Sequence, residues 1–328
     1  MSATDLTALL PLLTPENGTR VCFCTDDRQP SDLLDQGSID YLVRQAISGG
    51  VDPVLAIRAA TINPATYFRL NDRDAVAPGR KADLVVFSDL KAPRAEMVFR
   101  EGTLVAQNGK LLPWERPVKS TKARGSINVN WEKINFAIPA KGDQIKVIGM
   151  IPNQLVTEAL VEKASISGGY VVADPERDLI KFAVIERHYG TGKMGLGFLK
   201  GLGIKRGALA STVAHDHHNI VVAGADDESM FTAVRTIAAM QGGMAVAQGD
   251  KVLAQLALPI AGLMSDQPIE VVREQYDHLV AAARHLGSPL HDPMMGIGFM
   301  ALSVIPSLKL TDMGLVDVDA FELTSLFP

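Results

Sequence analysis

Two adjacent carboxylates, Asp26 and Asp27, follow a short apolar run near the start of the chain. The run Val21–Thr25 predicts a short buried strand, and catalytic acids are often found where a barrel strand ends. Alternation along that strand would point Asp26 into a barrel interior and leave Asp27 in the loop at its mouth. An Asp after a strand more often caps a helix or makes a turn. The pair therefore indicates chemistry only in combination with other motifs.

Cys22 and Cys24 share the face of Asp26 on the same predicted strand. The C-x-C spacing is a weak metal motif, and we interpret the two residues as buried core thiols. Two cysteines placed in this way suit a reducing compartment better than a disulfide scaffold.

Three histidines, an acid and an amide stand together in the sequence AHDHHN at 214–219. Imidazole can bind a metal or carry a proton, and a neighbouring carboxylate can fix its tautomer. A polar turn whose side chains satisfy backbone groups is the alternative interpretation. We take His215, His218 and Asn219 as candidate substrate-binding residues near an active-site mouth, and we disfavour a role as principal metal ligands.

Two further segments invite a functional interpretation but favour a structural one. In the glycine-rich segment Gly190–Gly203, Lys193 is followed by Met, whereas a phosphate-binding loop has Ser or Thr at that point. We therefore predict a turn-rich loop. The apolar segments 256–265 and 294–300 are predicted to pack in the core or between domains.

Composition excludes several classes of protein. The chain has 328 residues, 47% hydrophobic and 21% charged, which is typical of a globular protein with two or three domains. Its net charge of −5, without a basic patch, argues against a nucleic-acid partner. The apolar runs are shorter than the roughly 18 residues that span a bilayer, and the first residues lack the basic region of a signal peptide. These features predict a cytoplasmic protein that does not bind a membrane.

Periodicity and capping residues predict an order of elements. In the first part, helices are expected to begin at Ser38, at Asp52-Pro53 and at Asn63-Pro64. Three strands should follow, with a hairpin turn at Asn108-Gly109. These strands are predicted at 82–87, 97–100 and 103–107. In the second part, strands are predicted at 145–150, 168–173, 179–187, 208–214, 219–224 and 244–256, and helices at 227–241 and 268–286.

Six segments together carry a family resemblance. The sequences FCTDDRQPSDLLDQGSIDYLVRQAISGGVDP, AIRAATINPATYFRL and APGRKADLVVFSDL resemble the last barrel strand and the following small β domain of the amidohydrolase superfamily. With GALASTVAHDHHNIVVAG, LALPIAGLMS and SVIPSLKLTDMGL, the chain resembles the bacterial adenine deaminases over nearly its whole length. In that family a small polar residue is more usual at the position of His217.

The resemblance implies a fold that is α/β and then α+β. Residues 1–75 would hold the last strand and helices of a TIM-like amidohydrolase barrel, and 76–112 part of a small β-sandwich. Residues 113–141, rich in Pro, Lys, Arg and Ser, are predicted to be a linker. Residues 142–328 would form the α+β domain characteristic of adenine deaminases.

The resemblance also implies a reaction, in which hydroxide adds to C6 of adenine and ammonia leaves. A divalent metal, Mn or Fe or alternatively Zn, would supply hydroxide by lowering the pKa of bound water from 15.7 to roughly 7. Asp26 would ligate that metal and take the proton from the water. Asp27 would contact the purine ring, and Arg28 would hold the carboxylate pair or balance its charge.

The sequence departs from the superfamily in one respect. The H-x-H pair, the bridging acid and the later histidines of the superfamily should precede the last strand, yet only 25 residues precede Asp26 and none is His. A catalytic metal site uses about three protein ligands. The H-x-E and P-C-x-x-C motifs of cytidine deaminases are also absent. We therefore expect the C-terminal part of an adenine deaminase, which binds no metal stably and is inactive by itself.

The expected partners are adenine, an N-terminal amidohydrolase-barrel polypeptide that completes the enzyme, and further copies of the chain in a homo-oligomer. Three alternatives stay open at this point. The chain could be a mis-started or degenerate gene product, part of another metal-dependent amidohydrolase such as a hydantoinase or an adenosine-type deaminase, or a non-catalytic purine-binding or scaffold module.

Overall fold

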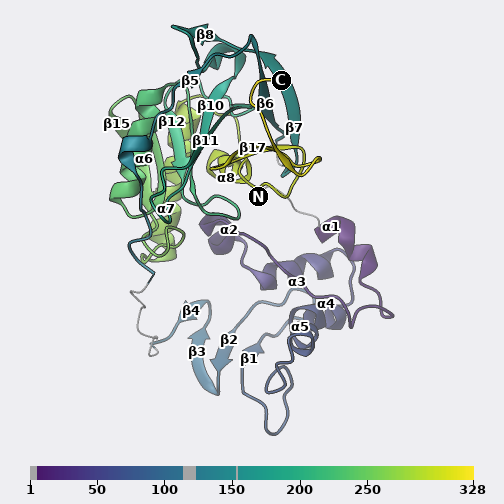
Figure 1. The fold of residues 1–328 in the computed structure, drawn as a ribbon. Helices are drawn as coiled ribbons and strands as arrows, with labels where there is room; N and C mark the ends of the chain where they lie inside the picture. Colours follow the sequence, from purple (N-terminus) through teal and green to yellow (C-terminus); the bar gives the residue numbers. More distant parts are fainter. Residues whose placement is uncertain (1–5, 114–122, 153) are drawn as a thin grey trace. The chain divides into compact units, whose positions relative to one another are not determined.

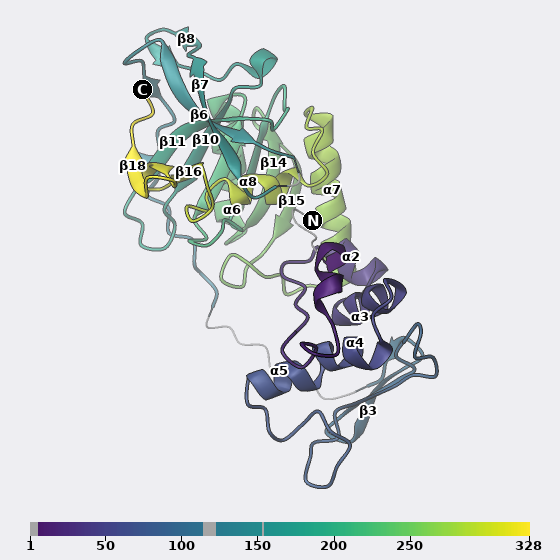
Figure 2. The same ribbon diagram turned by 90° about the vertical axis from the view of Figure 1, so that its right-hand side faces the viewer.

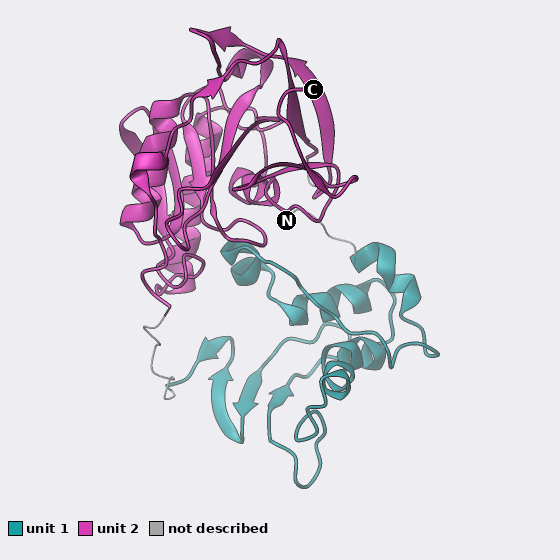
Figure 3. Cartoon of the chain, viewed as in Figure 1, with its two compact units in different colours: residues 1, 3–119 teal, residues 2, 120–328 magenta. Residues whose placement is uncertain are grey.

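The computed structural model of the chain describes residues 6–113, 123–152 and 154–328. It is a mixed α/β protein with several sheets (Figure 1). The chain divides into two compact units, unit 1 ending at residue 119 and unit 2 running from residue 120 to residue 328 (Figure 3). Each unit has its own core.

Unit 1 begins with short helices, and a capping residue explains where one of them starts. The carboxylate of Asp52 accepts hydrogen bonds from the backbone N–H groups of Val54 and Leu55, at 2.9 and 3.2 Å, so a helix begins where the capping residue predicts. The helices are α1 (Leu6–Leu9), a 3-10 turn at Leu10–Leu12, α2 (Pro30–Asp35), α3 (Ile39–Ser48), α4 (Pro53–Ala60) and α5 (Ile62–Tyr67).

A four-stranded antiparallel sheet completes unit 1. Its strands pair in chain order and are β1 (Leu84–Val86), β2 (Met97–Arg100), β3 (Thr103–Gln107) and β4 (Lys110–Leu111). The turn between β3 and β4 is Asn108-Gly109, with φ of 51° and 74°, which these two residue types adopt readily. The predicted hairpin turn is confirmed.

The predicted strand at 21–25 is wrong. These residues belong to no helix or strand. A backbone hydrogen bond of 2.9 Å from Phe23 N to Ala59 O ties them to α4, and the buried Asn63 side chain donates to Val21 O at 2.8 Å. A strand needs a neighbour along its length, whereas α4 and α5 contact this segment at separate points.

The alternation along this segment holds, but its faces are the reverse of those expected. Val21 and Phe23 pack against the small core of unit 1, whereas Cys22 and Cys24 are exposed. The prediction of buried thiols is therefore wrong. A barrel part up to residue 75 and a β-sandwich part from residue 76 stay predictions, since the described residues of unit 1 form one compact unit.

Unit 2 is built on an eight-stranded sheet of order β15-β14-β12-β13-β10-β11-β6-β7. Its strands are β6 (Gln144–Met150), β7 (Thr157–Lys163), β10 (Ile180–Ile185), β11 (Met194–Lys200), β12 (Ala208–Ser211), β13 (Ile220–Gly224), β14 (Gly243–Gln248) and β15 (Lys251–Ala257). All neighbours are antiparallel except β6 and β11.

Helices cover both faces of this sheet. On β10, Ile180, Phe182 and Val184 face a core shared with α7 (Ile269–His285) and α8 (Pro293–Phe299). Ala183 and Ile185 point the other way, toward α6 (Asp227–Ala239). Figure 2 shows α7 along the sheet. Because both faces are buried, these strands are continuous apolar runs and not alternating patterns.

Most predicted elements of unit 2 are confirmed, with several differences. The run 244–256 forms the hairpin β14–β15 and not one strand, and the run 168–173 contains only the two-residue strand β9 (Tyr170–Val171). Strand β7, helix α8 and a C-terminal three-stranded sheet were not predicted. That sheet consists of β16 (Leu308–Thr311), β17 (Gly314–Asp317) and β18 (Glu322–Thr324).

The glycine-rich segment contains a strand, so the prediction of a turn-rich loop is wrong for residues 194–200. Gly195 on β11 lies against the β16–β17 hairpin, where an added Cβ would be 1.9 Å from the carbonyl oxygen of Thr311. The glycine is needed because two backbones approach closely.

The predicted linker is too long. Ile134, Phe136 and Ile138 are buried in unit 2, Phe136 with only 1% of its surface exposed. Residues 138–139 form β5 (Ile138–Pro139), which pairs with β9, and β9 pairs with β8 (Ile166–Ser167). The Pro, Lys and Ser content of this stretch favoured a linker, although Ile134, Phe136 and Ile138 alternate with other residues as in a buried segment. Part of the predicted linker, 114–122, lies outside the described residues.

None of the helices in the described residues combines the length and the apolar character that crossing a bilayer requires.

Candidate functional site

Asp26 and Asp27 directly follow the irregular segment 21–25 of unit 1. Asp26 has a left-handed backbone, with φ of 53°, and its carboxylate accepts a hydrogen bond of 2.7 Å from the N–H of Asp27. Both residues are exposed. The described residues of unit 1 form one four-stranded sheet and no barrel. The expected placement of Asp26 inside a barrel is therefore not found in unit 1.

Arg28 is anchored to the helices that follow it. Its guanidinium donates to the side chain of Gln36 at 2.6 Å and to the carbonyl of Asp32 at 3.3 Å, and it lies 5.1 Å from the ring centroid of Tyr41. These contacts fix the base of the loop that carries the two acids. A direct role on the carboxylate pair stays a prediction.

The donor set of the described residues does not fit a catalytic metal. No group of three or more His, Cys, Asp or Glu side chains in the described part of the chain could hold one ion. Asp26 offers one carboxylate, and a hydrolytic site generally uses about three protein ligands. Ligands from other residues would be required.

The AHDHHN segment is a tight turn between β12 and β13. The N–H of His218 donates to the carbonyl of Ala214 at 2.7 Å, and the N–H of Asn219 donates to Nδ1 of His217 at 3.1 Å. A ring nitrogen of His188 lies 2.9 Å from the carbonyl oxygen of His217. Because Nδ1 of His217 accepts, the proton of its neutral ring belongs on Nε2. The polar-turn interpretation is correct for the backbone of this segment.

Side chains of the turn contact two other elements. His215 stacks on Phe299 of α8, with ring centroids 4.5 Å apart. Asn219 is only 3% exposed, and its Nδ2 donates to the Asp312 carboxylate at 3.0 Å in the β16–β17 turn. The buried Oδ1 of Asn219 has no hydrogen-bond partner among the residues that the structure describes. The amide is therefore held in one orientation, with one buried acceptor left unsatisfied among the described residues.

Burial keeps two of the histidines neutral. It lowers the pKa of His217, although the Asp312 carboxylate and the Ala301 carbonyl oppose the shift. Burial also lowers the pKa of His218, and the neighbouring His215 and Arg187 lower it further. At neutral pH both rings are suited to hydrogen bonding and not to binding an anion.

Glu186 and Arg187 adjoin this turn, although no sequence motif pointed to them. The buried Glu186 carboxylate accepts from the N–H groups of His188, Tyr189 and Thr191 and from the Thr191 hydroxyl. Burial by itself would raise the pKa of Glu186, but these hydrogen bonds lower it overall. The sequence signal that could have identified them is their position, because two charged residues directly follow the apolar run of β10.

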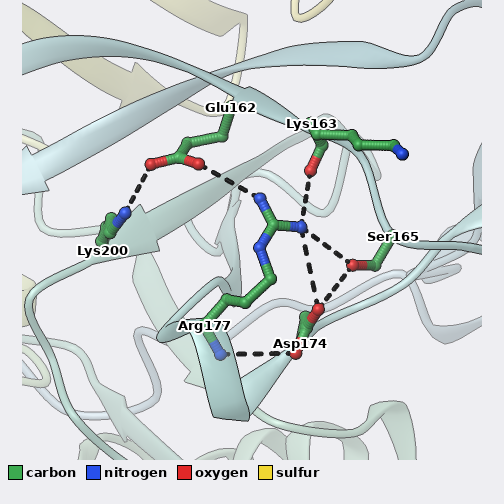
Figure 4. Close-up of polar contacts among 6 residues, drawn as sticks. All are labelled: Glu162, Lys163, Ser165, Asp174, Arg177 and Lys200. Atoms are coloured by element: carbon green, nitrogen blue, oxygen red, sulfur yellow. Dashed lines mark hydrogen bonds and ion pairs between the residues drawn. The ribbon is translucent and has the colours of Figure 1, made fainter.

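Figure 4 shows a second polar cluster, which joins β7 to β11. Arg177 donates to the Glu162 carboxylate at 3.1 Å and to the Lys163 carbonyl at 2.9 Å, and Lys200 pairs with the same carboxylate. Hydrogen bonding from Lys200, with Arg177, lowers the pKa of Glu162. Arg177 and Lys200 are each more than one third exposed, so solvent screens their ion pairs and the network contributes only modest stability. We interpret it as a structural cluster and not as a functional site.

The two apolar segments have mainly structural roles. Leu256 and Leu258 are buried in the core of unit 2, and so are Met294 and Met300, which confirms the core prediction for these four residues. Met264 is exposed.

Comparison with known proteins covers both units. Residues 154–322 match the adenine deaminase C-terminal domain, and residues 2–108 match the amidohydrolase family. Adenine deaminase of Desulfatibacillum aliphaticivorans is 47% identical over 325 residues, 99% of this chain and 57% of the relative. Adenine deaminase 2 of Carboxydothermus hydrogenoformans is 46% identical over 97% of the chain and 56% of the relative.

A relative from Brucella abortus, also named adenine deaminase, is 45% identical over 97% of the chain and 54% of its own length. The chain thus spans little more than half the length of these relatives. Since the C-terminal domain match alone covers more than half of its residues, the chain belongs to the adenine deaminase family.

Proposed function

We propose that this chain forms the C-terminal part of an adenine deaminase, which converts adenine and water to hypoxanthine and ammonia in purine salvage. The observation that carries the proposal is the identity of 45–47% to proteins named adenine deaminase, which extends through both units. The match to the C-terminal domain favours this activity over a hydantoinase or an adenosine-type deaminase.

In this proposal Asp26 is a catalytic residue and one ligand of a divalent metal, Mn or Fe or alternatively Zn. The described residues supply too few donors for that metal, so the region of the relatives that this chain does not cover would provide the others. Asp27 and Arg28 would contact the purine from the loop that α2 and α3 anchor. A homo-oligomer and a cytoplasmic location are further parts of the proposal.

His215, His218 and Asn219 are the proposed substrate-binding residues of unit 2. The available Oδ1 of Asn219 supports this role, because a purine carries N–H groups that need an acceptor. The neutral state of His218 suits an uncharged ligand.

The test joins this chain to the N-terminal segment of the Desulfatibacillum relative and measures hypoxanthine and ammonia release. We expect turnover by the joined enzyme. Asp26→Asn should reduce it by at least about 100-fold, the lower range for losing a general acid or base, and should lower the bound metal. Asp89→Asn is the matched control, because Asp89 is an exposed unit 1 acid whose carboxylate accepts a hydrogen bond from the neighbouring Lys91 N–H at 2.8 Å.

Unchanged turnover in Asp26→Asn would remove Asp26 from the site. Adenine binding measured by calorimetry, without turnover in the joined wild-type enzyme, would favour a non-catalytic purine-binding module.

A further inference from the structure

Arg187 is the largest side chain in the fully buried interior of unit 2, with 1% of its surface exposed. It stands directly after β10. Its Nε donates to the carbonyl of His218, Nη1 donates to the carbonyl and hydroxyl of Ser126 at 2.9 Å each, and Nη2 donates to the carbonyl of Ala261 at 2.9 Å. One guanidinium therefore connects three segments that are distant in sequence.

These segments are the start of the described part of unit 2, the AHDHHN turn and the apolar segment 256–265. Gly262 lies directly on the guanidinium, because a Cβ there would be 2.8 Å from Nη1 and 2.9 Å from Nη2. The backbone N–H of Asn128 donates to the carbonyl of Arg187 at 2.7 Å, which fixes the first segment a second time.

The hydrogen-bond acceptors of this buried cation are neutral oxygens. Removing a charge from water without an opposite charge is unfavourable unless its donors are satisfied. Burial lowers the pKa of Arg187 to about 10, and the charge of Glu186 opposes that shift. The planar guanidinium of Arg187 donates from three nitrogens to acceptors in fixed positions. The single ammonium group of a lysine cannot make the same set of hydrogen bonds.

We propose that Arg187 is a positioning residue for purine binding: it holds the AHDHHN turn so that Oδ1 of Asn219 is presented to an N–H group of the substrate. This inference rests on the proposed function for its ligand. His218, whose carbonyl Arg187 binds, directly precedes Asn219 and has a left-handed backbone with φ of 51°. The Asp312 carboxylate orients the same amide from its other side.

The first measurement is amide hydrogen exchange in the whole chain carrying Arg187→Lys. The amides of His218 and Leu263, which bond to Ala214 and Ile260, should exchange at least about tenfold faster, the effect of losing one hydrogen bond to a charged donor. The amide of Val222 in β13 should keep its rate. Equal acceleration at all three amides would show that Arg187 has only a general structural role. No acceleration at any of them would show that Arg187 does not hold the turn. Either result would overturn the proposal.

Two further variants keep the test decisive if Arg187→Lys folds poorly. Ser126→Ala removes one of the four oxygen acceptors and should accelerate the same amides by a smaller factor. Arg235→Lys is the matched control, since Arg235 is exposed on α6 and lies over the ring of Phe231. It should leave all these rates unchanged.

The second measurement uses the joined enzyme. Arg187→Lys should raise the KM for adenine about tenfold, the effect of one lost bond, with the bound metal unchanged and a smaller change in kcat. An unchanged KM would overturn the role in substrate binding even if exchange were faster. If the joined wild-type enzyme does not deaminate adenine, the proposed function and the substrate role both fail, and the exchange result still decides whether Arg187 holds the turn.

Discussion

Buried cations are the most unusual residues of unit 2. Arg187 donates to oxygens of three segments, and Lys181 pairs with Asp227 and the carbonyl of Phe136. Lys309 is fully buried, and its Nζ donates to the carbonyls of Leu155 and Phe299 at 2.7 and 3.1 Å. Each cation joins segments far apart in sequence, so each contributes to tertiary specificity as well as to local hydrogen bonding.

Lys309 should make the stability of unit 2 depend on pH. Burial lowers its pKa from 10.5 to about 8. Between these values the unfolded chain binds more protons than the folded chain, so the free energy of unfolding should rise as pH increases from 8 to 10.5. The rise should be on the order of 1 to 3 kcal/mol. Urea unfolding at both ends of this range would measure it.

Lys309→Met should remove this rise, and Lys251→Met on the exposed start of β15 is the control that should retain it. Other groups titrate in the same range, so the decisive quantity is the difference between each variant and the wild type. An identical pH dependence in wild type and Lys309→Met would contradict the prediction.

Strand β11 packs closely against the C-terminal hairpin at one glycine. Gly195 faces the carbonyl of Thr311 and the N–H of Gly314. A Cβ on Gly197, two residues along the same strand, would have side-chain atoms of Leu310 and Leu315 as its nearest neighbours, at 3.6 Å or more. The two glycines are on one face of one strand but meet different kinds of neighbour.

Gly195→Ala should destabilise unit 2 by about 2 kcal/mol or more, because the added methyl group meets backbone that cannot move without separating the hairpin from β11. Gly197→Ala, at ordinary contact distance, should change the free energy of unfolding by less than about 1 kcal/mol. Urea unfolding of the whole chain, followed by a signal from unit 2, would compare them. Equal effects would show that the hairpin is not seated on β11 in this way.

The two units differ in how much apolar surface they bury. Unit 2 buries both faces of its large sheet under helices and a hairpin. Unit 1 has a small core and exposes apolar side chains, among them Tyr67 at the end of α5, the following Phe68, Val76 in a loop and Leu111 on β4. Exposed apolar surface of this kind is typical of a region that contacts further protein.

We expect this chain by itself to bind Mn, Fe or Zn at far below one ion per chain and not to convert adenine. The physical reason is that the described residues offer no set of three ligands, so water would not be activated. Metal analysis of chain freed of other proteins, with a hypoxanthine assay, would test this. Joining the chain to the N-terminal segment of a relative should restore both properties. Turnover by the pure chain would contradict the expectation.

The sequence predicted local structure where a residue imposes it. The Asp52 cap, the Asn108-Gly109 turn and the apolar runs of β6, β10, β12 and β13 lie close to where their patterns place them. Family membership also followed from sequence, because it rests on ordered motifs along the chain. The strand at 21–25 was wrong because an apolar run forms a strand only when a partner pairs with it.

The ordered motifs of the chain were enough to indicate its family, and its local signals placed the strongest helices and strands. The folded chain was needed to show that Asn219 is buried against Asp312, that Arg187 joins three segments, and that Gly195 lets β11 approach the backbone of the C-terminal hairpin. The reason is that capping, turn and periodicity signals act over a few residues, whereas these contacts join residues separated by 31 to 116 positions and appear only when the chain has folded.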